Sequence, residues 1–404
     1  MIEKYYDGAI EQVAAGLGTV EKNYLLVRYS GQFSVENLND TKQLEKNEDI
    51  FVQVHEFETG EITCAYEPYL TMICDGFRRY MTGTFEEFME TCDVYYLHRP
   101  VLLGYFNQDN TGREEIILLD EVAYEQERML AALERMLCAI ADRHPVLFVL
   151  NRFQLASKST MQLTARFLKC ENCNIGLVLG VSDIQAMPEF LVPDWEMLYE
   201  TLDDGSKIYH IGNSGRKKEE TIDDEKYVDY GSEKVYRKLQ NMVEFLDFDQ
   251  AAYYLETIER KIKFDNLLVD DAARFRMWLL FVKVSILRQD IPKALEICED
   301  LEKIHLAGKE EECAYEQDYL IATAYMYQGK LKEALEMAGE TYRIAGKMSD
   351  DYRMFLSELL EAKIQMSGWY NIFFCAQDVK IKESLIQNLI RYNYRNHLAH
   401  VYIY

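Results

Sequence analysis

The stretch "LLVRYSGQFSVENL" (residues 25–38) decides the fold of the first part of this chain. It begins with apolar residues typical of a strand, passes through a turn of small residues and continues into the start of a helix. A strand, a short turn and a helix in this order form the layout of a phosphate-binding loop. The stretch therefore predicts an α/β domain and raises the question of whether residues 29–36 bind a nucleotide.

Four further apolar runs resemble this first strand. They cover residues 50–54, 146–151, 175–182 and 207–211. Their Val, Ile, Leu and Tyr residues hardly alternate with polar ones, which indicates strands buried on both faces of a parallel sheet. Segments with apolar residues at three- and four-residue spacing, such as 123–144, lie between the runs. We therefore predict a parallel sheet covered by helices within residues 1–212.

Length and composition restrict the class of protein. The chain has 404 residues, and a single core rarely grows past roughly 250–300 residues, so we expect two domains. A net charge of −25 and the lack of a Lys/Arg stripe argue against direct binding of nucleic acid. No signal peptide and no apolar run near the roughly 20 residues that span a bilayer are present, so we expect no membrane partner. Nine cysteines at irregular spacing suit a reducing cytoplasm.

The residues of a working phosphate-binding loop are replaced in this chain. The P-loop motif reads G-x-x-x-x-G-K-[ST] directly after the first strand. Aligned with it, Tyr29 and Ser34 stand at the two glycines, Val35 at the lysine and Glu36 at the Ser/Thr. Glu36 would place negative charge where a triphosphate binds. The same carboxylate suits the first turn of a helix, which it stabilises through the helix dipole.

The second half of a nucleotide site is an apolar strand that ends in acids, which hold Mg²⁺ and activate water. The run 146–151 supplies the strand, but it ends in Asn151 and is followed by Arg152. Asn151 could coordinate a metal weakly, whereas Arg152 could not polarise water. The seven histidines and the isolated Cys170/Cys173 pair form no metal-ligand motif, so we expect no metal and no cofactor.

Residues 144–168 resemble the stretch "hhhhLDDLHWADxxSLxLLxxL" of the signal-transducing AAA-type ATPases, the STAND class. Leu150, Gln154, Ala156 and a helix from Ser159 fit that frame. Its acidic pair and its later Asp are replaced by Asn151, Arg152 and Ser157. The resemblance covers about residues 1–212 and implies a P-loop-like fold that has lost catalysis. Its vestigial nucleotide site consists of Tyr29, Ser34, Val35, Glu36, Asn151 and Arg152, and none of these is expected to be catalytic.

Two other interpretations of this first domain stay open. It could be a nucleotide-binding switch or ATPase that uses a rebuilt, non-standard site. It could also be an unrelated α/β domain.

The second half contains a repeat of about forty residues. A charged linker at 213–233 is followed by similar helix junctions that begin at Leu246, Gln289, Gly329 and Gly368, spaced 43, 40 and 39 residues apart. The first three junctions carry a small residue near the sixth position, which lets paired helices approach closely. These residues are Ala251, Ala294 and Ala334.

These junctions resemble tetratricopeptide (TPR) repeats, whose second helix opens with Gly-Asp-Tyr-x-x-Ala-Leu. The resemblance implies an all-α, TPR-like domain over residues 234–404 that binds a protein or peptide. The stretch that we expect to contact this partner contains Tyr319, Tyr325 and Tyr327. Packing of all three tyrosines between helices is the alternative for that stretch, and a bundle without regular repeats is the alternative for the domain.

The last stretch, 383–404, has the pattern of a strong helix without a cap or a Gly or Pro stop. Natural ends more often fray into polar residues, so we expect the chain to be cut inside a repeat and to continue in a longer protein. The resemblance to STAND regulators with TPR-like arrays implies an output domain there, either a helix-turn-helix or a diguanylate cyclase. Such a domain would be a possible intramolecular partner of the repeats.

Overall fold

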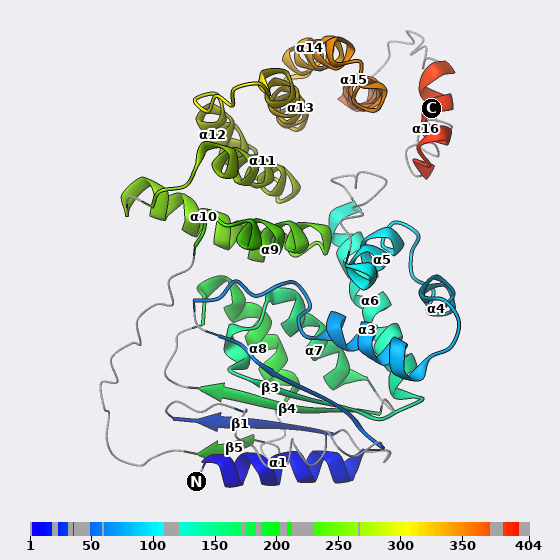
Figure 1. Cartoon of the computed structure of the whole chain (residues 1–404), viewed down its shortest axis with the longest axis vertical. Helices are drawn as coiled ribbons and strands as arrows, with labels where there is room; N and C mark the ends of the chain where they lie inside the picture. The colour runs from blue at the N-terminus through cyan, green and yellow to red at the C-terminus, as the bar shows by residue number, and fades with distance from the viewer. Residues whose placement is uncertain are drawn as a thin grey trace. The chain divides into compact units, whose positions relative to one another are not determined.

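The computed structural model describes residues 2–17, 23–30, 35, 49–58, 60–108, 121–170, 174–182, 187–202, 208–211, 229–265, 267–371 and 383–395. They divide into two compact units (Figure 1). The first unit contains the sheet and also residues 244–250, whereas the second contains residues 230–243 and the chain from Ala251 onward. Most of the predicted linker, residues 213–228, lies outside the described residues.

The first unit is built on a parallel sheet of five strands in the order β2-β3-β4-β1-β5. The strands are β1 (Tyr24–Tyr29), β2 (Phe51–Glu56), β3 (Val146–Asn151), β4 (Ile175–Ser182) and β5 (Ile208–Ile211). All residues of β3 and β4 are buried, as expected for strands covered on both faces. The five predicted strands are therefore confirmed, with β2 shifted toward the C-terminus by one to two residues.

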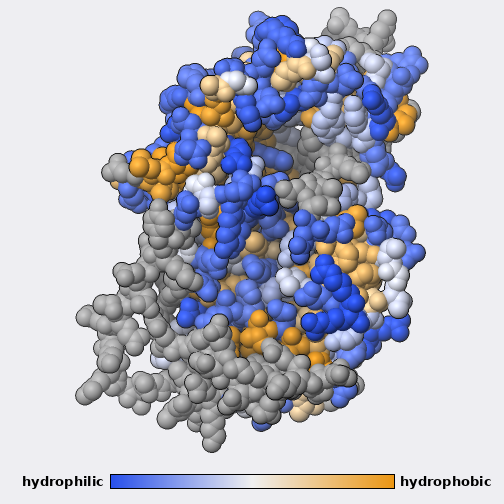
Figure 2. Space-filling view, in the orientation of Figure 1, coloured by the Kyte–Doolittle hydropathy of each residue, from blue (hydrophilic) through white to orange (hydrophobic). Residues whose placement is uncertain are grey.

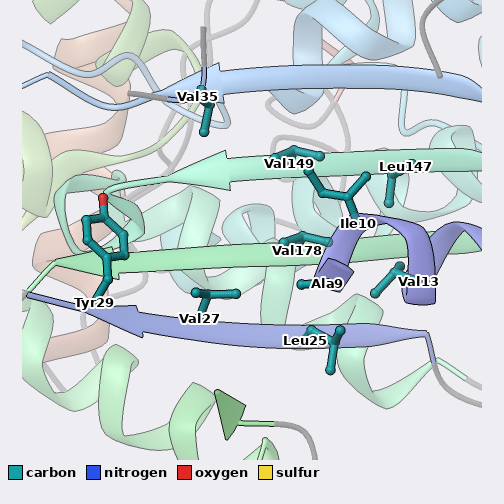
Figure 3. Close-up of a cluster of buried hydrophobic side chains, with 10 residues drawn as sticks. All are labelled: Ala9, Ile10, Val13, Leu25, Val27, Tyr29, Val35, Leu147, Val149 and Val178. Atoms are coloured by element: carbon teal, nitrogen blue, oxygen red, sulfur yellow. The ribbon is translucent and has the colours of Figure 1, made fainter. Parts of the chain in front are cut away.

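Helices cover both faces of this sheet. On one face, α1 (Ile2–Gly16) packs Ala9, Ile10 and Val13 against β1, β3 and β4 (Figure 3). On the opposite face, the ring of Phe148 from β3 lies 4.7 Å from the ring of Tyr69 in α3 (Tyr69–Tyr80). Tyr69 in turn lies 5.4 Å from Phe167 in α7 (Lys158–Lys169). The alternation of side chains along β3 separates these two layers.

The other helices of the first unit lie between the strands in the sequence. They are α4 (Phe85–Thr91), α5 (Arg99–Asn107), α6 (Val122–Ala141) and α8 (Val192–Thr201). The predicted helix at 123–144 corresponds to α6. Ser157 caps α7, because its hydroxyl accepts the backbone N–H of Thr160, and the helix begins at Lys158, one residue before the predicted Ser159.

Among the described residues, the second unit contains only helices. They are α9 (Glu233–Glu244), α10 (Phe248–Phe264), α11 (Asp271–Leu287), α12 (Ile291–Leu301), α13 (Glu310–Gln328), α14 (Leu331–Met348), α15 (Asp351–Asn371) and α16 (Glu383–Arg391). An α/β part followed by an all-α part is therefore confirmed. No described helix combines the length and apolar character that crossing a membrane requires. Hydrophilic residues cover much of the described surface seen in Figure 2.

The turns at the first three predicted junctions share one backbone conformation. Leu246, Gln289 and Gly329 each have a positive φ, of 66°, 63° and 81°. After the last two, the next N–H bonds back to a carbonyl five residues earlier, from Asp290 to Ser285 (2.8 Å) and from Lys330 to Tyr325 (3.0 Å). This is the hydrogen bond that closes a Schellman turn at a helix end. The junctions near 246, 289 and 329 are thus confirmed as helix turns.

The small residues after these turns are fully buried. Ala251, Ala294 and Ala334 are each 0 % exposed. Ala334 belongs to a cluster that joins Ala322 of α13 to Leu360 of α15. The absence of a larger side chain at position 334 therefore allows three helices to pack around one point.

Two predictions for the C-terminal part are wrong. Gly368 does not begin a turn, because it lies inside α15. The helix predicted for 383–404 is interrupted, because α16 ends at Arg391 and Asn393 adopts a left-handed φ of 59°. The Tyr394 N–H then bonds to the carbonyl of Leu389 at 2.9 Å, so asparagine ends this helix in the place that glycine often takes. Residues 396–404 lie outside the described residues.

Candidate functional site

The candidate site lies where the parallel strands end, since ligands of open α/β sheets bind outside the carboxyl ends of the strands. Tyr29 is the last residue of β1 and Asn151 the last residue of β3. Two of the predicted site residues, Ser34 and Glu36, lie outside the described residues. The other four are described and come together at the carboxyl ends of the strands: Tyr29, Val35, Asn151 and Arg152.

A buried hydrogen bond connects β1 to β3 at the site. The Tyr29 hydroxyl donates to Oδ1 of Asn151 at 2.6 Å, and the two residues are 2 % and 0 % exposed. Strand β4 lies between β1 and β3, so the phenol crosses β4 near the carboxyl end of that strand (Figure 3). Burial raises the pKa of Tyr29 to about 12, although Arg152 and Asn151 oppose the shift. The phenol is therefore neutral at physiological pH and acts as a donor.

Glu56, the last residue of β2, connects the other predicted positions. Its Oε1 lies 3.4 Å from Nε of Arg152, and its Oε2 accepts the backbone N–H of Val35 at 3.1 Å. The Val35 side chain is 3 % exposed and packs into the core beneath the sheet edge. The sequence analysis did not identify Glu56, which lies two residues after the end of the predicted strand 50–54.

This arrangement leaves little chemistry for a nucleotide. A phosphate needs backbone N–H groups and a cation, but the Val35 N–H and the Arg152 guanidinium both face Glu56. A carboxylate at this place also repels a triphosphate. In the described part of the chain, no group of three or more His, Cys, Asp or Glu side chains could hold a metal ion.

A second polar cluster surrounds the start of α7 and was not predicted. The backbone N–H of Ser159 donates to Oδ2 of Asp247 at 3.0 Å, and that of Lys158 donates to Oε1 of Gln250 at 3.3 Å. Nζ of Lys158 also pairs with Asp249. Free N–H groups at a helix start need such acceptors. Here a segment 88 to 92 residues later in the sequence supplies them.

We call residues 244–250 the anchor segment, because several contacts fix it in the first unit. Besides the contacts with α7, Nε2 of Gln126 donates to the carbonyl of Leu246 at 2.7 Å. The ring of Phe245 packs edge-on against Tyr66 (6.3 Å) and Tyr105 (5.8 Å). The anchor segment contains the first turn of α10, the helix that continues into the second unit. The chain therefore passes from the first unit into the second at the end of the anchor segment, after Gln250.

Asp247 gives the anchor segment a pH-dependent stability. Burial raises the pKa of Asp247 to about 6, above the ordinary ~3.9, against the opposing effects of the Ser159 hydrogen bonds and the Lys158 charge. Because the folded protein binds this proton more tightly than the unfolded chain, the carboxyl stabilises the fold fully below about pH 4. That contribution is lost as the pH rises through about 6.

We expect Asp247→Asn to remove this dependence while its amide oxygen still accepts the Ser159 N–H. The quantity to compare is the unfolding free energy of the variant minus that of wild type, measured by urea denaturation at several pH values. This difference should increase from about pH 4.5 to about pH 7 and then level off. Asp142→Asn is the control for loss of one charge, since Asp142 is exposed in the same unit. A difference that does not change with pH would contradict the assignment.

The structure places the three predicted partner-binding tyrosines differently along α13. Tyr319 is half-buried, stacks on Tyr315 with ring centroids 6.0 Å apart, and has a pKa far above its ordinary value because of burial. Tyr325 packs against the cluster around Ala334, and Nζ of Lys330 lies 5.4 Å from its ring. Tyr327 is 37 % exposed. Of the three, Tyr327 offers the most accessible ring, and a partner role for all three stays a prediction.

The described residues form an α/β unit and a helical unit. No protein-family model matches this chain, and no match was found among curated proteins or among solved structures.

Proposed function

We propose that this chain is a non-catalytic signalling scaffold. In this proposal the first unit is a degenerate, STAND-type P-loop domain, and the second unit is a TPR-like array that binds a protein or peptide. The observation that carries the proposal is the buried hydrogen bond between Tyr29 and Asn151 at 2.6 Å. It joins the two positions at which a P-loop ATPase would bind phosphate and metal.

The loss of hydrolysis follows from the groups at this edge. Phosphoryl transfer depends on positioned charge: a lysine and backbone N–H groups on the phosphates, and carboxylates on Mg²⁺. Here Tyr29 fills the position of the first glycine, and Arg152 stands where an acid would hold the metal. Arg152 itself faces Glu56. These groups support a domain that does not hydrolyse nucleotide.

The helical unit supports the interaction role. Its left-handed turns at 289 and 329 join α11 to α12 and α13 to α14, which pack against each other, and Ala294 and Ala334 are buried. Stacked pairs of this kind form extended surfaces that hold peptides or helices. A partner could belong to another protein or to an output domain of the same polypeptide.

A nucleotide-binding switch is the second candidate, and one observation favours it. Arg152 has a left-handed φ of 53°, and non-glycine residues with such strained backbones are enriched at functional sites. Its side chain is 24 % exposed, so an anion could reach it by displacing Glu56.

Isothermal titration of the full chain with ATP and with ADP, each with Mg²⁺, separates the two candidates. The scaffold proposal predicts no saturable heat up to millimolar nucleotide and no phosphate release above that of the buffer. Saturable binding that Arg152→Gln abolishes, together with phosphate release, would establish the switch instead. Arg143→Gln provides the matched control, because Arg143 is an exposed arginine of the same unit.

A further inference from the structure

A pocket of about 250 Å³ opens within the second unit, between α14, α15 and α16. Its floor is Phe355, which is 1 % exposed. The ring of Tyr392 stacks on Phe355 with centroids 4.8 Å apart, and Tyr342, 37 % exposed, lines the pocket from α14. The pocket therefore combines a fixed aromatic floor with accessible tyrosine at its edge.

Charges line this pocket asymmetrically. Asp351 and Glu358 contribute two carboxylates from α15, and Arg391 contributes one cation from α16. Asp351 and Glu358 are seven residues apart on one helix, so they lie on the same face and about 10.5 Å apart along its axis. The chain as a whole carries a net charge of −25, which attracts cations to such a surface.

Aromatic rings and carboxylates together favour one kind of ligand group. A guanidinium or ammonium group can lie on a tyrosine face and pair with a carboxylate, while its aliphatic stem covers apolar surface. An acidic ligand would instead meet two carboxylates. The available volume accommodates side chains rather than a folded element, so the ligand enters as an extended segment.

We propose that this pocket binds a basic peptide segment whose two cationic side chains are three positions apart. The inference rests on the proposed function, because it assigns a chemical class to the partner of the helical unit. In a polyproline II conformation, residues three apart point to the same side and lie about 9.3 Å apart. One cationic side chain then pairs with Asp351 and the other with Glu358.

Fluorescence anisotropy of the full chain tests this proposal. The probe is a fluorescein-labelled octapeptide with two arginines separated by two prolines, and its partner probe has glutamine in place of both arginines. We expect saturable binding of the arginine probe only, and weaker binding at 500 mM than at 50 mM NaCl, since salt screens exposed ion pairs. Asp351→Asn and Glu358→Gln should each weaken binding by about threefold, as expected for partly exposed ion pairs.

Two further variants distinguish recognition from a change in folding. Arg391→Gln should strengthen binding of the arginine probe, because it removes a repelling cation, whereas damage to the fold would weaken it. Glu336→Gln removes one charge from an exposed position of α14 outside the pocket and should leave binding unchanged.

The proposal would be overturned if the two probes bound equally well or if neither bound. It would also be overturned if Glu336→Gln and Glu358→Gln had equal effects on binding. The nucleotide titration would be unaffected by either outcome, so failure of this inference is distinguishable from failure of the scaffold proposal.

Discussion

Replacing Tyr29 by alanine is expected to lower the free energy of unfolding of the sheet unit by about 3–5 kcal/mol, the cost typical of deleting a buried aromatic side chain. Tyr29 is 2 % exposed and belongs to the cluster between α1 and the sheet. Its loss leaves a cavity at the ends of β1 and β3 and removes the donor to Asn151. Urea denaturation measures the loss, and hydrogen exchange should locate it in β1 and β3.

Tyr29→Phe is the matched control for this prediction. It keeps the ring and removes only the hydroxyl that donates to Asn151, so it should cost about 1–3 kcal/mol as a buried polar contact is lost. Neither variant should hydrolyse ATP, because Arg152 still stands where an acid is needed. Equal stability of Tyr29→Ala and wild type would show that the phenol does not close the site. ATPase activity in either variant would contradict the scaffold proposal.

Replacing Ala334 by leucine is expected to destabilise the helical unit by about 1–3 kcal/mol, because the added atoms overfill a packed core. Ala334 is 0 % exposed and lies among residues of α13, α14 and α15, including Met326 and Ile364. The larger side chain has to push these helices apart. The buried Trp278 of the same unit can report the change by fluorescence during urea denaturation.

Ala272→Leu is the control for this substitution. Ala272 is exposed on α11, so leucine there adds the same atoms without entering a helix contact. We expect its unfolding free energy to stay within about 0.5 kcal/mol of wild type, as is usual for surface substitutions. A similar loss in both variants would mean that Ala334 is not required for close approach of the helices.

The sheet could be predicted from the sequence because its signals are local. The runs at 24–29, 146–151 and 175–182 coincide with β1, β3 and β4, since strands buried on both faces consist mainly of apolar residues. The helix turns at 246, 289 and 329 were visible for a similar reason. A change from apolar spacing to a short polar turn marks where one helix ends and the next begins.

The candidate site was predictable only in part. Tyr29 and Asn151 were recognised as substitutions at two separate motif positions, and the parallel order of the strands brings them to one edge. Their hydrogen bond spans 122 residues of sequence and could not be read from either motif. Glu56 was missed because nothing near it in the sequence indicates that Val35 and Arg152 would face it.

The sequence by itself determined the α/β part and the helical part, because periodicity is a property of neighbouring residues. Only the tertiary structure decided that Tyr29 donates a hydrogen bond to Asn151 at the carboxyl ends of the strands. It also decided that residues 244–250 join the first unit, with Asp247 accepting the Ser159 N–H, and that Gly368 lies inside a helix. These features depend on partners that are distant in the sequence or on packing that outweighs a local turn signal. Chain topology brings such groups together. Asp247, an acidic residue of a predicted turn, is only 4 % exposed and is therefore part of a core.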